Sequence, residues 1–227
     1  MFLIYSNLLF SQSKSEELNL TTDSDTVYWN RIQNEKIKKY NLGFNESKKD
    51  ELFFRFWTHG NCIEITKRDT LIIGKSIYFV DEVDDFSKNN FVKTFDLKKS
   101  VCEKILNLID SCKVNTIPSD KFIKGWQQGF DGTTYIFENK TKTEYSFKNY
   151  WTPTSQENLE VAKKIQNFVD KLRRICDSEN LSKQFTKEIP FRSYTYNGSS
   201  VIVSRIMTTD EYKKYLKEKR KMKKHND

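Results

Sequence analysis

The chain has 227 residues, enough for one domain with a substantial hydrophobic core. Its 17 Phe, 11 Tyr and 4 Trp stand beside only 7 Gly and 3 Pro, a composition that favours a sheet-rich globular body. The net charge is +8, and no stretch reaches the ~18 apolar residues that a membrane span requires.

Residues 1–12 form an uncharged, mostly apolar segment that ends in Phe-Ser-Gln and precedes polar sequence. The pattern is typical of the second half of a secretory signal peptide whose basic start is missing, as if the start codon were placed too late. The alternative is a short N-terminal strand of a cytoplasmic protein. We expect export, which would make the protein periplasmic or secreted, with residues 13–26 as a flexible segment.

The four cysteines follow no zinc-binding spacing. In an oxidising compartment one or two disulfides could form, and the alternative is that the thiols are buried small hydrophobes. Cys102 and Cys112 fall on one predicted helix, roughly 15 Å apart by helical rise, which excludes a bond between them. The remaining two cysteines are Cys62 and Cys176.

A helix is predicted from about residue 25 to residue 41, and antiparallel strands are predicted over residues 51–83. In the first strand Phe54 and Phe56 fall on one face, opposite Arg55. An acidic cluster follows the strands, and we interpret it as a solvated turn because it lacks the glycine and ligand order of a calcium loop. The cluster comprises Asp81, Glu82, Asp84 and Asp85.

Apolar spacing predicts a helix over residues 96–112, with Asp96 as its N-cap. The clearest secondary-structure pattern is that of residues 126–176. It predicts a hairpin with its loop at residues 139–143, a corner at Thr152-Pro153, and a helix over residues 154–176.

Two finer expectations concern this stretch. Thr154 and Glu157 match a capping box at the start of the helix. The hairpin aromatics are expected to form a nearly continuous surface beneath the helix; they are Tyr135, Phe137, Tyr145 and Phe147.

Asn197-Gly198 predicts the turn of a closing hairpin, and a last helix begins near residue 208. Residues 212–227 contain eight Lys or Arg against two acids, so they carry six of the eight net positive charges. This basic tail could contact anionic lipid or another polyanion, although a solvated terminus is the simpler interpretation.

These elements together predict an α+β fold. An antiparallel sheet of about six to eight strands would carry the helices 96–112 and 154–176 on one face. A possible N-terminal helix and a basic C-terminal helix would complete it, with a single domain over residues 27–207 and a basic tail over residues 208–227.

Four sequence segments together resemble a group of exported proteins from Gram-negative bacteria that have no established activity. The segments are FRFW (from Phe54), DGTTYIFE (from Asp131), YSFKNYWTP (from Tyr145) and EIPF (from Glu188). The resemblance covers roughly residues 25–207 and implies the compartment and the order of elements, without any catalytic residue.

Motifs for phosphate loops, nucleophile elbows and dinucleotide sites are absent. Of two histidines, His225 lies in the basic tail, so a histidine triad or multi-histidine metal site would depend on His59, which we interpret as an exposed turn residue. A pair of carboxylates could still catalyse hydrolysis, and the first candidates for such a pair are Asp131, Glu138 and Glu144.

Trp126 and Trp151 could form an aromatic binding platform, although a place in the core under the helix is the simpler interpretation. We therefore expect no catalytic, cofactor-binding or metal site, and a non-catalytic binding or envelope-structural domain. The alternatives are a hydrolase of an envelope polymer and a periplasmic inhibitor or immunity-type protein. The partner is unknown; another envelope protein is one candidate, and nucleic acid is the least expected.

Overall fold

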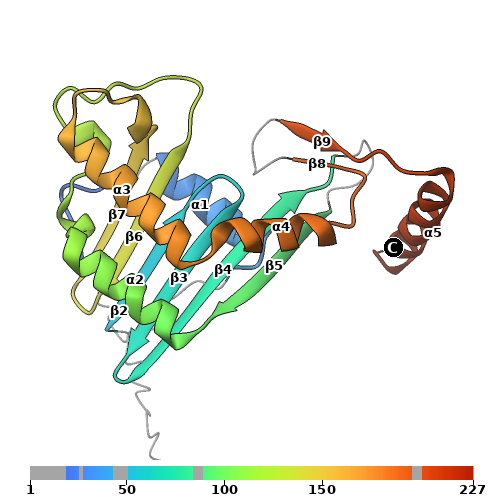
Figure 1. The fold of residues 1–227 in the computed structure, drawn as a ribbon, viewed down its shortest axis with the longest axis horizontal. Coiled ribbons are helices and arrows are strands. Elements are labelled where there is room, and N and C mark those ends of the chain that lie inside the picture. The colour runs from blue at the N-terminus through green and yellow to red at the C-terminus, as the bar shows by residue number, and fades with distance from the viewer. Residues whose placement is uncertain (1–18, 26–27, 43–50, 84–88, 196–200, 227) are drawn as a thin grey trace, which may run out of the picture.

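The computed structural model describes residues 19–25, 28–42, 51–83, 89–195 and 201–226. They form an α+β fold around one largely antiparallel sheet (Figure 1), which confirms the predicted fold class. Within these residues no helix has the length and apolar character needed to cross a membrane. In chain order the elements are β1 (Asn19–Leu20), α1 (Tyr28–Lys39), β2 (Leu52–Trp57), β3 (Asn61–Arg68), β4 (Leu71–Asp81), β5 (Asn90–Leu97), α2 (Lys99–Cys112), η1 (Val114–Thr116), η2 (Asp120–Phe122), β6 (Thr134–Thr141), β7 (Glu144–Trp151), η3 (Pro153–Ser155), α3 (Glu160–Ile175), α4 (Ser178–Glu188), β8 (Ser193–Thr195), β9 (Ile202–Ser204) and α5 (Thr209–Asn226).

Within the described residues the main sheet has seven strands, in the order β1-β7-β6-β2-β3-β4-β5. Every pairing is antiparallel except that of β1, whose two residues pair in parallel with β7. The predicted hairpin is confirmed as β6 and β7, but the predicted loop at residues 139–143 is wrong, because β6 continues to Thr141 and the loop is only residues 142–143. The turn is closed by the Glu144 amide, which donates to Thr141 Oγ1 at 3.1 Å. Runs of aromatic and β-branched residues predicted these strands, and residues on both faces of the central strands are buried.

The expected continuous aromatic surface of the hairpin is wrong. Lys148 lies opposite Phe137 in the register, so Tyr150 shares the face of Phe137, and their ring centres lie 5.2 Å apart. Phe147 falls on the other face, next to α1. A loop over residues 139–143 would place Glu138 opposite Glu144, whereas Glu138 lies opposite Phe147. The register is thus shifted by three residues, and a shift by an odd number of residues exchanges the two faces of a strand.

Helices α2 and α3 cover one face of the sheet, as predicted (Figure 1). Phe168 of α3 packs with its ring centre 5.4 Å from Phe137 and 6.2 Å from Phe54. The buried core on this face comprises Phe54, Phe56, Ile63, Ile65, Cys102, Ile105, Leu108, Ile109, Val114, Tyr135, Phe137, Tyr150, Ile165, Phe168, Val169, Leu172 and Cys176.

The predicted caps of α2 and α3 are wrong. Asp96 belongs to β5, and the N-cap of α2 is Lys98 without a side-chain hydrogen bond. Thr154 lies inside the short helix η3, and α3 begins only at Glu160. The cause is Thr152, whose left-handed backbone (φ 37°) turns the chain directly into η3 at Pro153.

Helix α1 covers the opposite face, which confirms the predicted N-terminal helix. Tyr40, immediately after α1, stacks on Phe79 with ring centres 4.3 Å apart. The second core comprises Ile37, Tyr40, Leu42, Trp57, Cys62, Ile77, Phe79, Ile136 and Phe147. The sheet is therefore buried on both faces near its centre.

Helix α4 and the small β8–β9 sheet form a third apolar cluster at the ends of β4 and β5. The Phe185 ring stacks on Phe91, with centres 5.5 Å apart. An isolated bridge between Glu82 and Tyr194 joins β8 to the main sheet. The predicted turn at Asn197-Gly198 lies outside the described residues, as does the predicted export segment 1–12.

The predicted basic C-terminal helix is present as α5, which lies at one end of the molecule (Figure 1). It is attached through Tyr215, whose hydroxyl donates to Glu82 Oε1 at 3.0 Å, and Lys219, whose Nζ lies 3.5 Å from the same oxygen. Asp81 accepts hydrogen bonds from Lys39 and Tyr40. Two members of the acidic cluster thus pair with other elements, and its other two residues lie outside the described part of the chain.

None of the four cysteines forms a disulfide. Cys62, Cys102 and Cys176 are buried, and Cys112 is partly exposed. Burial raises the pKa of the Cys176 thiol to about 12, so this group remains neutral. These thiols serve as small hydrophobic side chains in the two cores.

Candidate functional site

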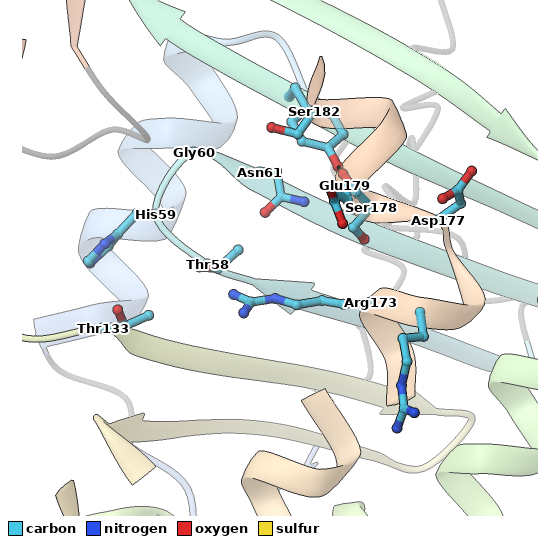
Figure 2. A pocket seen from close by; sticks show the side chains of 12 residues that line it. Thr58, His59, Gly60, Asn61, Thr133, Arg173, Asp177, Ser178, Glu179 and Ser182 are labelled. Carbon is cyan, nitrogen blue, oxygen red and sulfur yellow. Dashed lines mark hydrogen bonds between the residues drawn. The ribbon is translucent and has the colours of Figure 1, made fainter. Parts of the chain in front are cut away.

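A cavity of about 530 Å³ opens between the turn that joins β2 to β3 and the junction of α3 with α4 (Figure 2). Its walls come from segments that lie more than a hundred residues apart in the chain. The lining residues are Thr58, His59, Gly60, Asn61, Tyr78, Thr133, Arg173, Arg174, Asp177, Ser178, Glu179 and Ser182.

One wall is the 58–61 turn. The Thr58 amide donates to the Asn61 carbonyl at 3.0 Å, which closes the turn. The Phe79 amide donates to the Gly60 carbonyl at 3.0 Å, which holds the turn on the next strand. Thr58 and Asn61 therefore present a hydroxyl and an amide from a fixed backbone.

The opposite wall begins at Asp177, whose left-handed backbone (φ 52°) separates α3 from α4. Asn180 Nδ2 donates to both carboxylate oxygens of Asp177 at 2.9 Å. The Tyr78 hydroxyl donates to the Ser178 carbonyl at 3.0 Å and ties the corner to the sheet. The Asp177 side chain makes no capping hydrogen bond to the first-turn amides of α4.

Arg173 supplies positive charge inside the pocket. Figure 2 shows its side chain extending across the opening toward Thr58 and Asn61. Its guanidinium carbon lies 5.4 Å from the centre of the Tyr135 ring, a cation–π contact that restrains the side chain. A planar guanidinium held in this way can bind a carboxylate or phosphate with two parallel hydrogen bonds.

The acidic residues of the pocket lie at its exposed rim. The Glu179 side chain is 81% exposed, and its Oε1 lies 2.6 Å from Lys183 Nζ. Asp177 is exposed and bonded to Asn180. The pocket thus lacks the pair of buried carboxylates that would support glycoside hydrolysis.

His59 lines the pocket but is oriented away from Arg173. It is half-buried rather than an exposed turn residue as expected, and its ring lies beside α1 in Figure 2. Burial lowers the pKa of His59, and the charge of nearby Lys36 lowers it further. The imidazole is therefore neutral near pH 7, without a carboxylate partner of the kind that orients a catalytic histidine.

The three carboxylates named as hydrolase candidates do not meet. Asp131 is exposed before the start of β6, whereas Glu144 is exposed at the start of β7, beyond the other end of β6. A strand of this length separates them by roughly 20 Å. Glu138 lies between them and is buried.

Glu138 instead belongs to a buried polar cluster on the α1 side of the sheet. Its carboxylate accepts hydrogen bonds from Arg55 at 3.3 Å, from Trp57 Nε1 at 2.8 Å and from Tyr145 at 2.9 Å. Arg55 Nε lies 2.8 Å from Glu64 Oε1. These contacts occupy Glu138 structurally, and the sequence signal for them was Arg55 itself, a charged residue inside the apolar run FFRFW.

Burial determines the ionisation behaviour of this cluster. It raises the pKa of Glu64, and Glu138 raises it further against the opposing charge of Arg55. Burial acts to lower the pKa of the Arg55 guanidinium, but Glu138 and Glu64 outweigh it, so the net pKa is raised. Arg55 therefore remains charged and holds the two glutamates together.

Of the two tryptophans considered as a binding platform, Trp126 packs against the core beneath α3, and Trp151 is half-buried at the end of β7. Trp126 Nε1 donates to the Trp151 carbonyl at 3.0 Å, and the Trp126 ring centre lies 6.0 Å from that of Tyr150.

Among the described residues no group of three or more His, Cys, Asp or Glu side chains is placed to hold a metal ion. No protein-family model and no curated protein sequence matches this chain.

Proposed function

We propose that this chain is a non-catalytic binding domain that holds an anionic group of a small ligand in the pocket between the 58–61 turn and α4. The observation that carries the proposal is the position of Arg173, which extends into a cavity of about 530 Å³ while resting on Tyr135. A cavity of this volume suits a small molecule.

The surroundings of Arg173 support an anion as the bound group. The first turn of α4 contributes backbone amides and the positive end of a helix dipole. Thr58 and Asn61 add a hydroxyl and an amide that would hydrogen-bond neutral parts of the ligand. The rim acids, Asp177 and Glu179, already have partners in Asn180 and Lys183.

Binding of three probes would test this proposal: inorganic phosphate, D-glucuronate and a dipeptide with a free carboxyl terminus. At about ten times its dissociation constant, a ligand raises the melting temperature of a protein of this size by roughly 3–6 °C. We expect at least one probe to produce such a shift. Arg173→Ala should abolish it, and Arg173→Lys should restore it only in part because the bidentate geometry is lost.

Lys171→Ala is the matched control, because it removes one positive charge from an exposed position on the same helix outside the pocket. A general effect of charge would weaken binding equally in Lys171→Ala and Arg173→Ala. That result, or the failure of all three probes to stabilise the wild-type protein, would contradict the proposal.

We also propose that the domain acts outside the cytoplasm, in the periplasm or in secreted form. The apolar segment 1–12 and the resemblance to exported proteins support this location. The test is to express the gene with its upstream in-frame codons and to fractionate the cells. Unprocessed protein found only in the cytoplasm would refute export.

A further inference from the structure

The segment between η2 and β6 presents an aromatic side chain entirely to solvent. Phe130 is fully exposed (107%), the largest such value among the exposed hydrophobic residues that the structure describes, and Phe122, the last residue of η2, is 50% exposed. Single exposed apolar residues are common on surfaces. Phe130 differs because the backbone that carries it is held in place on both sides.

The first attachment of the segment is Gln156. Its Oε1 accepts the Gln127 amide at 2.9 Å, and its Nε2 donates to the Gln127 carbonyl at 2.9 Å. Gln156 is only 4% exposed, so this pair of hydrogen bonds is shielded from water. Nearby, Trp126 Nε1 donates to the Trp151 carbonyl.

The second attachment consists of the two glycines that flank Phe130-Asp131. A Cβ on Gly129 would lie 2.5 Å from the Trp151 ring, and a Cβ on Gly132 would lie 2.0 Å from Thr152 Oγ1. Both glycines thus place bare backbone against the β7 end of the sheet. Because the backbone on either side of it is held close to the protein, the Phe130 side chain projects outward.

We propose that this loop is a docking site for a protein partner that offers an apolar pocket to Phe130 and a basic group to neighbouring Asp131. An aromatic anchor on a preorganised loop loses little conformational freedom on binding, which is the usual character of an interface hot spot. The exposed side chain of Gln127 supplies hydrogen-bonding groups for the rim of such an interface, whereas that of Gln128 is already bonded to Asp120.

A protein fits this surface better than a membrane does. An anionic bilayer would be drawn to the basic helix α5, which lies at the opposite end of the molecule from the loop (Figure 1). A bilayer that met α5 would therefore leave Phe130 in water. Asp131, directly beside Phe130, would also be repelled by anionic lipid.

The docking site is separate from the anion pocket proposed above, because neither Phe130 nor Asp131 lines that pocket, to which this loop contributes only its last residue, Thr133. The first experiment places a photo-crosslinking phenylalanine analogue at position 130 of the full chain in cells of the source organism. The matched position is Leu71, an exposed apolar residue (56%) in the hairpin between β3 and β4. We expect a protein adduct at position 130 that is absent at position 71.

The captured protein is then purified, and its affinity is measured against three variants. Phe130→Ala should weaken binding at least about 30-fold, which corresponds to about 2 kcal/mol, whereas Leu71→Ala should leave it unchanged. Asp131→Asn should weaken it less and should reduce its salt dependence. Phe130→Ala should unfold at the same denaturant concentration as wild type, since the side chain is fully exposed, and Arg173→Ala should bind this partner normally.

Three outcomes would overturn the proposal. The first is the absence of an adduct specific to position 130. The second is a captured protein that binds Phe130→Ala within about threefold of wild type, well short of a hot-spot effect. The third is an adduct that contains lipid only, together with vesicle binding that is lost in Phe130→Ala.

Discussion

Arg55 and Glu138 lie opposite each other on β2 and β6, and Arg55 Nη1 is 3.3 Å from Glu138 Oε2 near the centre of the sheet. Both side chains are at least nine-tenths buried. Glu64, the residue opposite Arg55 on β3, lies on the other side of the guanidinium. Three neighbouring strands are therefore joined by one buried cation.

The first prediction concerns the loss of a partner from this group. Glu138→Gln should lower the free energy of unfolding by about 3–5 kcal/mol, because Arg55 would keep its charge while losing a buried counter-ion. Glu144→Gln removes the same charge at an exposed position of the neighbouring strand and should change stability by less than about 0.5 kcal/mol. Urea denaturation of both variants measures the difference, and equal stabilities would show that the pair contributes nothing.

The second prediction concerns the loss of stability at low pH. Asp23 Oδ2 lies 2.7 Å from Lys148 Nζ and links the N-terminal segment to β7. Burial acts to raise the pKa of Asp23, but hydrogen bonds from Lys148 and Thr21 outweigh it, so the net pKa lies below the usual 3.8. Because the pKa of Asp23 is lower in the folded protein than in the unfolded chain, the ionised carboxylate stabilises the folded state at pH values above the unfolded pKa. This stabilisation is lost as the pH falls through the pKa of the folded protein.

Asp23→Asn should therefore be less stable than wild type at neutral pH by roughly 1–3 kcal/mol, the cost of leaving the buried Lys148 donor poorly satisfied. The difference should shrink as the pH falls below 3.8 and through the lowered pKa of wild-type Asp23, because that side chain then becomes neutral as well. Denaturation at several pH values checks this. A difference that does not depend on pH would mean that packing, rather than charge, is responsible.

The third prediction concerns the contact between β4 and α2. A Cβ on Gly74 would lie 2.5 Å from Cys102 Sγ and 2.7 Å from Ile65 Cδ1. Gly74→Ala should destabilise the protein by about 1–3 kcal/mol through overpacking. Adding Cys102→Ala should recover part of this loss, so the double variant should be more stable than the sum of the single changes. Strict additivity in thermal unfolding would disprove the contact.

The fourth prediction concerns the attachment of α5. Tyr215→Phe removes the hydroxyl that donates to Glu82, and it should increase the detached population of α5 about tenfold. Limited trypsin digestion followed by mass spectrometry reports this, because α5 is rich in Lys and Arg. Tyr212→Phe, one turn earlier, is the matched control, and equal cleavage of both variants would contradict the assignment.

The same attachment should be sensitive to alkali. Burial, followed by the Glu82 contact, raises the pKa of Tyr215 to about 12. Because the pKa of Tyr215 is higher in the folded protein than the ordinary tyrosine value of 10.0, its contact with Glu82 stabilises the folded state fully below pH 10. This stabilisation is lost as the pH rises through about 12. Trypsin cleavage within α5 should accelerate over this interval in wild type but not in Tyr215→Phe, once corrected for the pH dependence of the protease.

The sequence was sufficient for features that depend on local periodicity. Apolar spacing identified α2 and α3, and alternation placed Phe54 and Phe56 on the face opposite Arg55. Both signals arise from the need to bury one side of an element.

Features that depend on distant contacts could not be predicted. The start of α3 is decided by Thr152 and by the hydrogen bonds of Gln156 to Gln127, not by the local capping pattern. The pocket combines the 58–61 turn with Arg173 and α4, and no local pattern indicates that these segments meet. The face occupied by Phe147 was missed because the hairpin loop is shorter than expected, which shifts the register by three residues.

The backbone conformation of Asp177 determines how the two helices that line the pocket are angled to each other. Arg173 belongs to α3, whereas Ser178 and Ser182 belong to α4, and this one left-handed residue sets the angle between the two helices. Glycine would retain that backbone conformation, whereas a β-branched residue would disfavour it. A single substitution at position 177 would thus tilt one wall relative to the other, and it would change the size of ligand that the pocket admits while Arg173 stayed in place.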